Sequence, residues 1–255
     1  MTQFSSLSSA PRLNPKTSVL ILGRGYVGNF LSQRLPHAHW TRRDTFHLSR
    51  PSTWKNHHLL FSSSQHVIWT FPAASHDSEE KLALDFFDEF LSHAQVLIYG
   101  TTSAYKVRTQ DEWITEESPL DLTQVRTRTE ESLRKKGACI LHLSGIFGPH
   151  RDPLTWYQRG LIRSGSSYLN LIHVNDIVNV TEKLIARDDK KGQRFNLSNG
   201  RPKTHQQIIE ELKNKHLLPP EFNLPRLEIP SSKRISSAQI KKFLSLSDSE
   251  FIDFP

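Results

Sequence analysis

Short apolar runs alternate with amphipathic stretches along most of the chain. The apolar runs are rich in Val, Ile and Leu, which is typical of buried parallel strands, and the stretches between them repeat apolar residues at helical spacing. The pattern predicts strands at 18–22, 38–41, 65–71, 96–99, 141–149 and 193–197. It predicts helices at 29–35, 79–93, 122–137, 177–186, 204–216 and 236–244. This alternation predicts an α/β fold with a doubly wound parallel sheet.

Two helix starts, one loop and the N-terminal segment add detail to this outline. Asp176 and Thr204 stand where a side chain caps the first turn of the helix that follows. The proline-rich segment 217–230 predicts a loop around one short strand. Residues 1–16 contain Ser and Pro without periodicity, and we expect a flexible leader there.

A glycine-rich turn, GRGYVG at 23–28, lies directly between the first strand and the first helix. Gly23 permits a tight turn, Gly25 lets backbone approach a pyrophosphate, and Gly28 lets the helix pack closely. The free N–H groups and the positive dipole end of the helix would then face the phosphates. The order of strand, turn and helix predicts a Rossmann-type dinucleotide site. The cofactor-binding residues expected here are Gly23, Gly25, Tyr26, Val27 and Gly28.

The end of the second strand bears on the choice of dinucleotide. An NAD site usually has an Asp or Glu here for the ribose 2′-OH, whereas an NADP site has Arg against the 2′-phosphate. Arg42 and Arg43 occupy this position, and Asp44 follows them slightly late for the ribose. We therefore favour NADP(H) as the cofactor, with NAD(H) as the alternative.

Composition narrows the class of protein. A chain of 255 residues suits one large α/β domain with a small appendage. The net charge of +7 is spread over short basic pairs and triplets, so we expect a solvated surface and no nucleic-acid binding. The single cysteine, Cys139, lies in an apolar run, which favours a core role, a reducing compartment and hence the cytoplasm. We expect no membrane span, and no metal-ligand spacing is found.

Six motifs occur in one order: GRGYVG, WTFPA, YGTTSAY, WITEESPL, ILHLSGIFGP and YLNLIHVNDI. Together they resemble the extended short-chain dehydrogenase/reductases, the nucleotide-sugar epimerase and dehydratase group, and most closely its short atypical members. The resemblance covers about residues 18–202. It implies a seven-stranded parallel sheet that binds NAD(P), with a core at 17–150 and a small C-terminal substrate lobe at 151–255 interleaved with the last core elements.

The resemblance also implies where the site residues lie. Phe71 and Pro72 end the third strand at the edge where ligands bind in such sheets. Thr101 or Thr102 would supply the hydroxyl that binds a substrate oxygen, or would only close the turn after the strand. The segment expected under the nicotinamide is Ser144, Gly145 and Ile146.

The catalytic YxxxK pair of the family is missing. The residues four positions after the five tyrosines are Phe30, Ser103, Thr109, Leu161 and Ile172. By resemblance, Leu122 stands at the tyrosine site and Arg126 at the lysine site, where Arg126 would hydrogen-bond the nicotinamide ribose. Tyr105 is the candidate stand-in for proton transfer, and the alternative is that it only packs.

These observations predict an oxidoreductase or epimerase that acts on a small polar substrate, sugar-like ones included. The alternative is a non-catalytic NADP(H)-binding sensor or partner-binding module that has lost the chemistry. A homodimer is compatible with either function. Fold alone does not identify the substrate.

Overall fold

The computed structural model describes residues 17–162, 164–227 and 231–254. The expected leader at 1–16 lies outside these residues. A six-stranded parallel sheet forms the centre, in the order β10-β6-β4-β3-β1-β2. Its strands are β1 (Val19–Leu22), β2 (His39–Trp40), β3 (His66–Trp69), β4 (Gln95–Thr101), β6 (Cys139–Leu143) and β10 (Arg194–Leu197). The predicted doubly wound parallel sheet is therefore confirmed.

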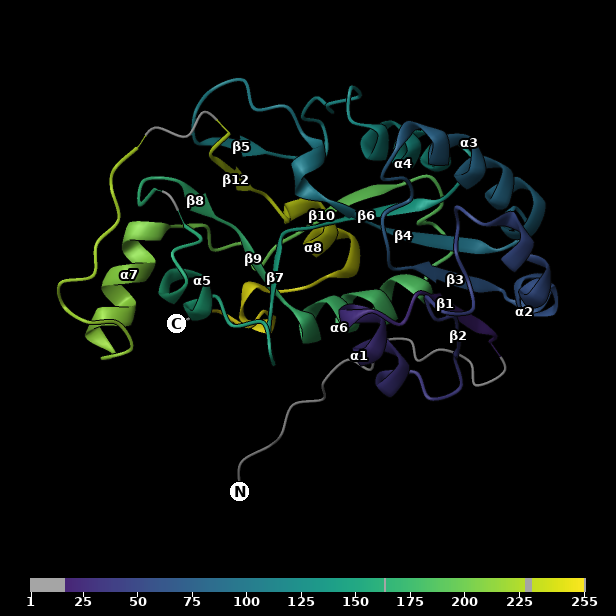
Figure 1. Ribbon diagram of the computed structural model, residues 1–255, viewed down its shortest axis with the longest axis horizontal. Coiled ribbons are helices and arrows are strands. Elements are labelled where there is room, and N and C mark those ends of the chain that lie inside the picture. Colours follow the sequence, from purple (N-terminus) through teal and green to yellow (C-terminus); the bar gives the residue numbers. More distant parts are fainter. Residues whose placement is uncertain (1–16, 163, 228–230, 255) are drawn as a thin grey trace.

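Helices cover both faces of the sheet (Figure 1). One face packs against α1 (Tyr26–Arg34), α6 (Val174–Ile185) and α8 (Ala238–Leu244). The other packs against α2 (His58–Ser63), α3 (Asp77–Phe86) with its continuation η3 (Phe87–Leu91), and α4 (Val125–Lys135). In β1, Val19 and Ile21 belong to the first core and Leu20 and Leu22 to the second, because successive strand residues point to opposite faces.

The seventh strand that the resemblance implied is absent from the sheet in the described part of the chain. The segment after β2 instead forms the short turns η1 (Pro51–Thr53) and η2 (Lys55–His57) before α2. Its aromatic residues Phe46 and Trp54 are buried against Phe86 of α3. Because these rings are buried against α3, the segment packs on that helix and does not pair with β2. Among the described residues, no further strand therefore extends the sheet beyond β2.

The fifth expected strand, 141–149, is two strands. β6 ends at Leu143, and the chain continues as β7 (Gly145–Phe147), which pairs with β9 (Leu171–His173) outside the central sheet. The backbone turns at Ser144, whose N–H donates to the carbonyl oxygen of Leu197 (3.0 Å).

A second region covers one end of the sheet. It contains α5 (Leu154–Gln158), the pair β8 (Tyr168–Leu169) and β11 (Lys203–Thr204), and α7 (His205–Asn214), which share an apolar core. The pair β5 (Glu112–Ile114) and β12 (Lys233–Ile235) lies beside it in Figure 1. The expected loop at 217–230 contains no strand over 217–227, and 228–230 lie outside the described residues.

The two expected helix caps have different outcomes. Thr204 caps α7 through a reciprocal pair of hydrogen bonds with Gln207, as predicted. Asp176 is not a cap, because α6 begins earlier, at Val174, and His173 accepts the capping hydrogen bond. Asp176 is 2% exposed and accepts from the backbone N–H of Ile252 (2.9 Å). Burial raises the pKa of its carboxyl to about 6.

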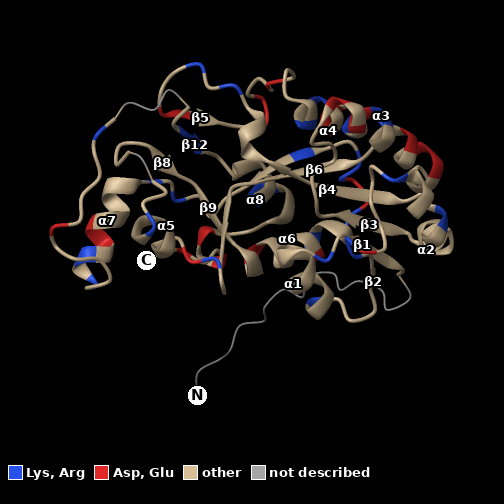
Figure 2. Ribbon diagram, viewed as in Figure 1, with Lys and Arg blue, Asp and Glu red and all other residues tan. Residues whose placement is uncertain are grey.

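Charged residues of both signs are interspersed over the described elements (Figure 2). Arg128 of α4 forms ion pairs with Asp77 and Glu80 of α3, and Lys136, directly after α4, forms one with Asp88 of η3. In the described ranges, no helix has the length and apolarity needed to cross a membrane.

Candidate dinucleotide site

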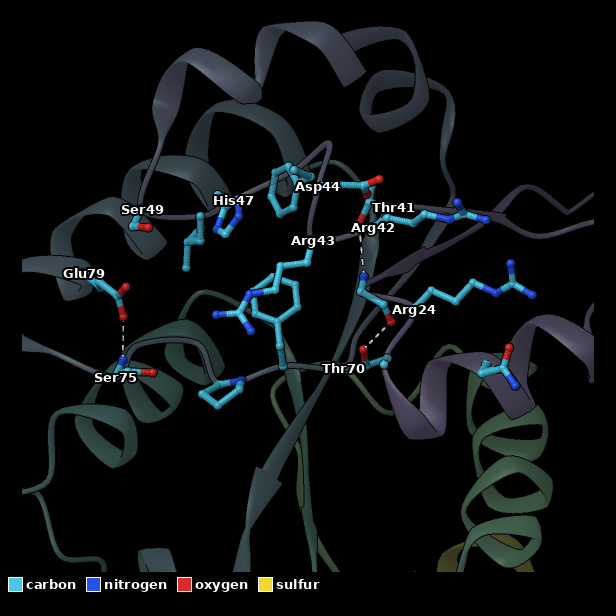
Figure 3. Close-up of a pocket in the computed structure, with 17 residues that line it drawn as sticks. Arg24, Thr41, Arg42, Arg43, Asp44, His47, Ser49, Thr70, Ser75 and Glu79 are labelled. Carbon is cyan, nitrogen blue, oxygen red and sulfur yellow. Dashed lines mark hydrogen bonds between the residues drawn. The ribbon is translucent and has the colours of Figure 1, made fainter. Parts of the chain in front are cut away.

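A cavity of about 1000 Å³ opens at the carboxyl ends of β1, β2 and β3 (Figure 3). From β1 the chain proceeds to β2 on one side, while β3 lies on the other, so the cavity is at the switch point of the sheet. Its walls come from the glycine turn after β1, the segment after β2, and the residues Thr70, Phe71 and Pro72 after β3.

The three glycines of the turn differ in what a Cβ at each position would contact. Gly23 has a φ of +93°, and a Cβ there would lie 2.8 Å from the ring of Phe71. A Cβ on Gly28 would lie 2.1 Å from the carbonyl oxygen of Gly23, which is far inside contact distance. A Cβ on Gly25 would meet nothing within 4 Å, because Gly25 faces the open cavity. The geometry therefore leaves room for a ligand at Gly25.

Two threonines hold the turn in place. The Gly23 N–H donates to Thr41 Oγ1 (3.0 Å), and the Gly23 carbonyl oxygen accepts from Thr70 Oγ1 (2.6 Å). Thr41 follows β2 and Thr70 follows β3, so the turn is fixed by both neighbouring strands. This anchoring keeps the start of α1 at the floor of the cavity.

The side chains of Tyr26 and Val27 do not line the cavity. The Tyr26 hydroxyl donates to the carbonyl oxygen of Pro149 (2.9 Å), and Val27 packs in the core. Their backbone N–H groups belong to the first turn of α1, where a helix has no internal acceptors to offer. Any contact of these two residues with a phosphate is therefore a backbone contact.

Three arginines, Arg24, Arg42 and Arg43, line the cavity. Among the described residues none of them forms an ion pair with a carboxylate. The guanidinium carbons of Arg24 and Arg42 lie 4.5 and 4.8 Å from the centre of the Trp40 ring. Figure 3 shows Arg43 directed toward the centre of the cavity, whereas the side chains of Arg24 and Arg42 extend in the opposite direction.

Arg24 was missed by the sequence analysis. Its Nε is buried without a hydrogen-bond partner among the described residues. The sequence feature that could have identified Arg24 is its position as a charged residue inside the glycine turn. Only the fold, however, brings Arg24 beside Trp40 and Arg42 at the end of β2. Asp44, the alternative ribose acid, lines the same cavity. Arg24, Arg42 and Arg43 are therefore three cavity-lining guanidinium groups without a carboxylate partner in the described part of the chain.

The expected substrate end lies at the carboxyl ends of β4 and β6. The Thr101 hydroxyl accepts from the Ser103 N–H (3.2 Å) and caps a short turn, and Thr102 is buried. The hydroxyl of Ser144 is buried and has no hydrogen-bond partner within the described ranges, and Gly145 and Ile146 continue into β7. These residues follow adjacent strands, because Thr101 pairs with Leu143.

Tyr105 lies in a buried polar network. It is 3% exposed, its hydroxyl donates to Asn196 Oδ1 (2.7 Å), and His142 Nδ1 lies 3.0 Å from the same oxygen. Burial raises the pKa of the phenol. Proton transfer by Tyr105 to a substrate would require its hydrogen bond to Asn196 to break.

The structure also describes Leu122 and Arg126, which the resemblance places at the tyrosine and lysine positions. Leu122 is 50% exposed. The guanidinium of Arg126 donates to Glu130 Oε1 (2.6 Å) and to the carbonyl oxygen of Tyr99 (2.9 Å). Arg126 therefore helps to hold α4 against β4. The contact with the nicotinamide ribose that we expect of Arg126 remains a prediction.

Solved structures share this fold. WbmG from Bordetella bronchiseptica, in complex with NAD, superposes with a TM-score of 0.72 at 14% identity, covering 95% of this chain and 92% of that one. A GDP-L-fucose synthetase from Naegleria fowleri, bound to NADP, has a TM-score of 0.71 at 12% identity, covering 100% and 94%. A functionally unknown conserved protein from Silicibacter pomeroyi has a TM-score of 0.67 at 21% identity, covering 91% and 93%.

At these identities the likeness establishes the fold, and it confirms the Rossmann-type architecture expected from the sequence. No family model matches the sequence, and no curated protein matches it.

Proposed function

We propose that this protein binds NADP(H) in the cavity beside the glycine turn. The observation that carries the proposal is the group of three arginines that lines the cavity without carboxylate partners among the described residues. A buried Arg24 Nε with no partner there is costly unless an anion is bound, and a 2′-phosphate is such an anion. The neighbours described as complexes with NAD or NADP support a dinucleotide in this fold.

The residues present fit the parts of this cofactor. The pyrophosphate would lie over Gly25 and the first turn of α1, where backbone N–H groups are free. Arg24 and Arg42 would hold the 2′-phosphate, and Trp40 would keep their guanidinium groups in position. Arg43 and Phe71 would line the adenine side. When bound, the reduced cofactor supplies a hydride.

The activity we propose is an oxidoreductase or epimerase reaction on a small polar substrate. Thr101 would hydrogen-bond a substrate oxygen at the end of β4, and Ser144 to Ile146 would support the nicotinamide beside it. One neighbour is described as a GDP-L-fucose synthetase, which keeps sugar-like substrates among the candidates. Because Tyr105 is engaged in the buried network, its role in the proposal is to hold the segment after β4 to Asn196 of β10, across the intervening strand β6.

A second candidate is a non-catalytic NADP(H)-binding protein. It is favoured by the positions of the missing pair, where Leu122 has no proton to transfer and Arg126 is engaged with Glu130. Such a protein would bind the cofactor with the same preference and show no turnover. The two candidates therefore share the site and differ in the chemistry.

A calorimetric titration with NADPH and then with NADH tests the proposal. We expect micromolar binding of NADPH and weaker binding of NADH. A folded sample that binds neither would overturn both candidates. If NADPH binds, a screen of aldehydes, ketones and sugar nucleotides, followed by nicotinamide absorbance, separates the enzyme from the non-catalytic protein.

A further inference from the structure

A carbonyl substrate reduced at this site needs a proton from a group other than the missing tyrosine. Leu122 has no proton to give, and a guanidinium stays protonated, so Arg126 cannot exchange one. Tyr105 is held by Asn196 and His142 inside the core. The proton donor therefore has to be a side chain of another element that reaches the carboxyl ends of β4 and β6.

β12 carries a lysine, Lys233, whose side chain reaches the end of β4. Lys233 Nζ donates to the carbonyl oxygen of Thr102 (2.7 Å), 131 positions away along the chain. Asn170 fixes the strand that carries the lysine, because its Nδ2 donates to the Lys233 carbonyl oxygen (2.8 Å) and its Oδ1 accepts from the Ile235 N–H (2.7 Å). The carbonyl oxygen of Asn170 accepts from the Gly145 N–H (2.9 Å). The lysine is thus tied to both strand ends.

Hydroxyl groups stand at the same two strand ends. Thr101 ends β4 and pairs with Leu143, so Ser144 follows on the adjacent strand. The Ser144 hydroxyl is buried and has no hydrogen-bond partner among the described residues. The Thr101 hydroxyl donates to Ser103 Oγ (3.2 Å), so Lys233 and Ser144 offer the two donor groups at this edge of the sheet.

The ammonium group of Lys233 is not neutralised by a carboxylate of the described chain. It forms no ion pair there, and the one acid whose charge acts on it is Glu112 of the paired strand. The Glu112 carboxylate accepts from the backbone N–H of Arg108. Burial lowers the pKa of Lys233, which makes the ammonium a stronger acid. Thr102 uses one of its three N–H groups, and no other described residue accepts from Nζ, which leaves the others for a ligand.

We propose that Lys233 is the proton donor to a carbonyl oxygen bound between the ends of β4 and β6. This inference rests on the proposed function, because NADPH is the hydride source. As the carbonyl carbon gains the hydride and the C=O π bond breaks, the oxygen takes a proton from Nζ. A C–H and an O–H bond form, the dinucleotide is oxidised, and the neutral amine regains a proton from water. The substrate class is an aldehyde or ketone.

Chemical trapping tests the position of Lys233 without the cofactor. The wild-type protein is incubated at pH 7 with pyridine-4-carboxaldehyde and cyanoborohydride, and adducts are mapped by mass spectrometry. We expect the adduct on Lys233 to form at least about three times faster than on Lys135, an exposed lysine of α4, because a lowered pKa leaves more free amine. Equal or slower labelling of Lys233 would overturn the inference.

Variants test the chemistry. Lys233→Gln and Lys233→Arg should bind NADPH within two-fold of the wild type and lower kcat by about 100-fold for an aldehyde that the wild type reduces. Lys135→Gln is the control and should retain kcat. Retained kcat in both Lys233 variants, or a wild type that binds NADPH but reduces no aldehyde or ketone, would overturn the role of Lys233. A wild type that fails to bind NADPH would instead overturn the proposed function, and the trapping result would stand by itself.

Discussion

Arg24→Ala is the sharpest test of the cofactor assignment. The guanidinium lies 4.5 Å from the centre of the Trp40 ring, and its Nε is buried without a partner in the described part of the chain. If Arg24 donates to the 2′-phosphate, its removal costs one charged hydrogen bond, about 1.5–3 kcal/mol. The Kd for NADPH should therefore rise about 10- to 150-fold. The Kd for NADH, which lacks this phosphate, should change by less than about two-fold.

The folded state should survive this substitution. Alanine at this position removes the cation–π interaction with Trp40, which contributes about 0.5–1 kcal/mol when exposed. For a chain of this size the melting temperature should fall by about 1–4 °C. Loss of binding then reports on the site and not on unfolding.

Calorimetric titration of both dinucleotides is the assay, and Arg50→Ala is the matched control. Arg50 is exposed on the same segment as Arg42 but does not line the cavity, and its removal lowers the net charge equally. We expect the control to bind NADPH within about two-fold of the wild type. The reasoning is refuted if Arg24→Ala weakens NADPH and NADH equally, or if Arg50→Ala reproduces its effect.

Three further substitutions test the turn and a buried acid. Gly25→Val should fold, because its Cβ enters open space, but should abolish NADPH binding in calorimetry; retained affinity would refute the site. Gly28→Ala should lower the free energy of unfolding in urea by about 3 kcal/mol, since its Cβ would lie 2.1 Å from the Gly23 carbonyl oxygen, and a decrease below about 0.5 kcal/mol would contradict this. Asp176 has a pKa raised to about 6, so the folded state loses stability as pH rises from about 4 to 6. Asp176→Asn should therefore raise the melting temperature more at pH 8 than at pH 4, and an equal change at both would count against it.

The sequence alone was sufficient for the central sheet and the glycine turn. Buried parallel strands need continuous apolar runs, and the surrounding helices need an apolar stripe, so both leave local patterns. The glycines are equally local in origin, since Gly23 needs a positive φ and Gly28 a close backbone approach. Thr204 was identified as a cap for the same reason, because its partner Gln207 is three residues away.

Other features could not be predicted from the local sequence. The missing seventh strand depends on Phe46 and Trp54 packing against Phe86, a contact between distant segments. Asp176 was assigned as a cap because the sequence cannot show that α6 begins at Val174. Such boundaries are decided by what a segment packs against and not by its own composition.

The same distinction between sequence and tertiary structure applies to the residues of the site. By itself the sequence determined that a glycine turn precedes a helix and that none of the five tyrosines is followed four positions later by a lysine, because both are statements about residue type and spacing. Only the tertiary structure decided that Arg24 joins Arg42 beside Trp40, that Tyr105 is buried, and that Lys233 reaches the end of β4. These contacts join residues far apart along the chain, and whether a polar group is free to bind a ligand depends on neighbours that only folding supplies.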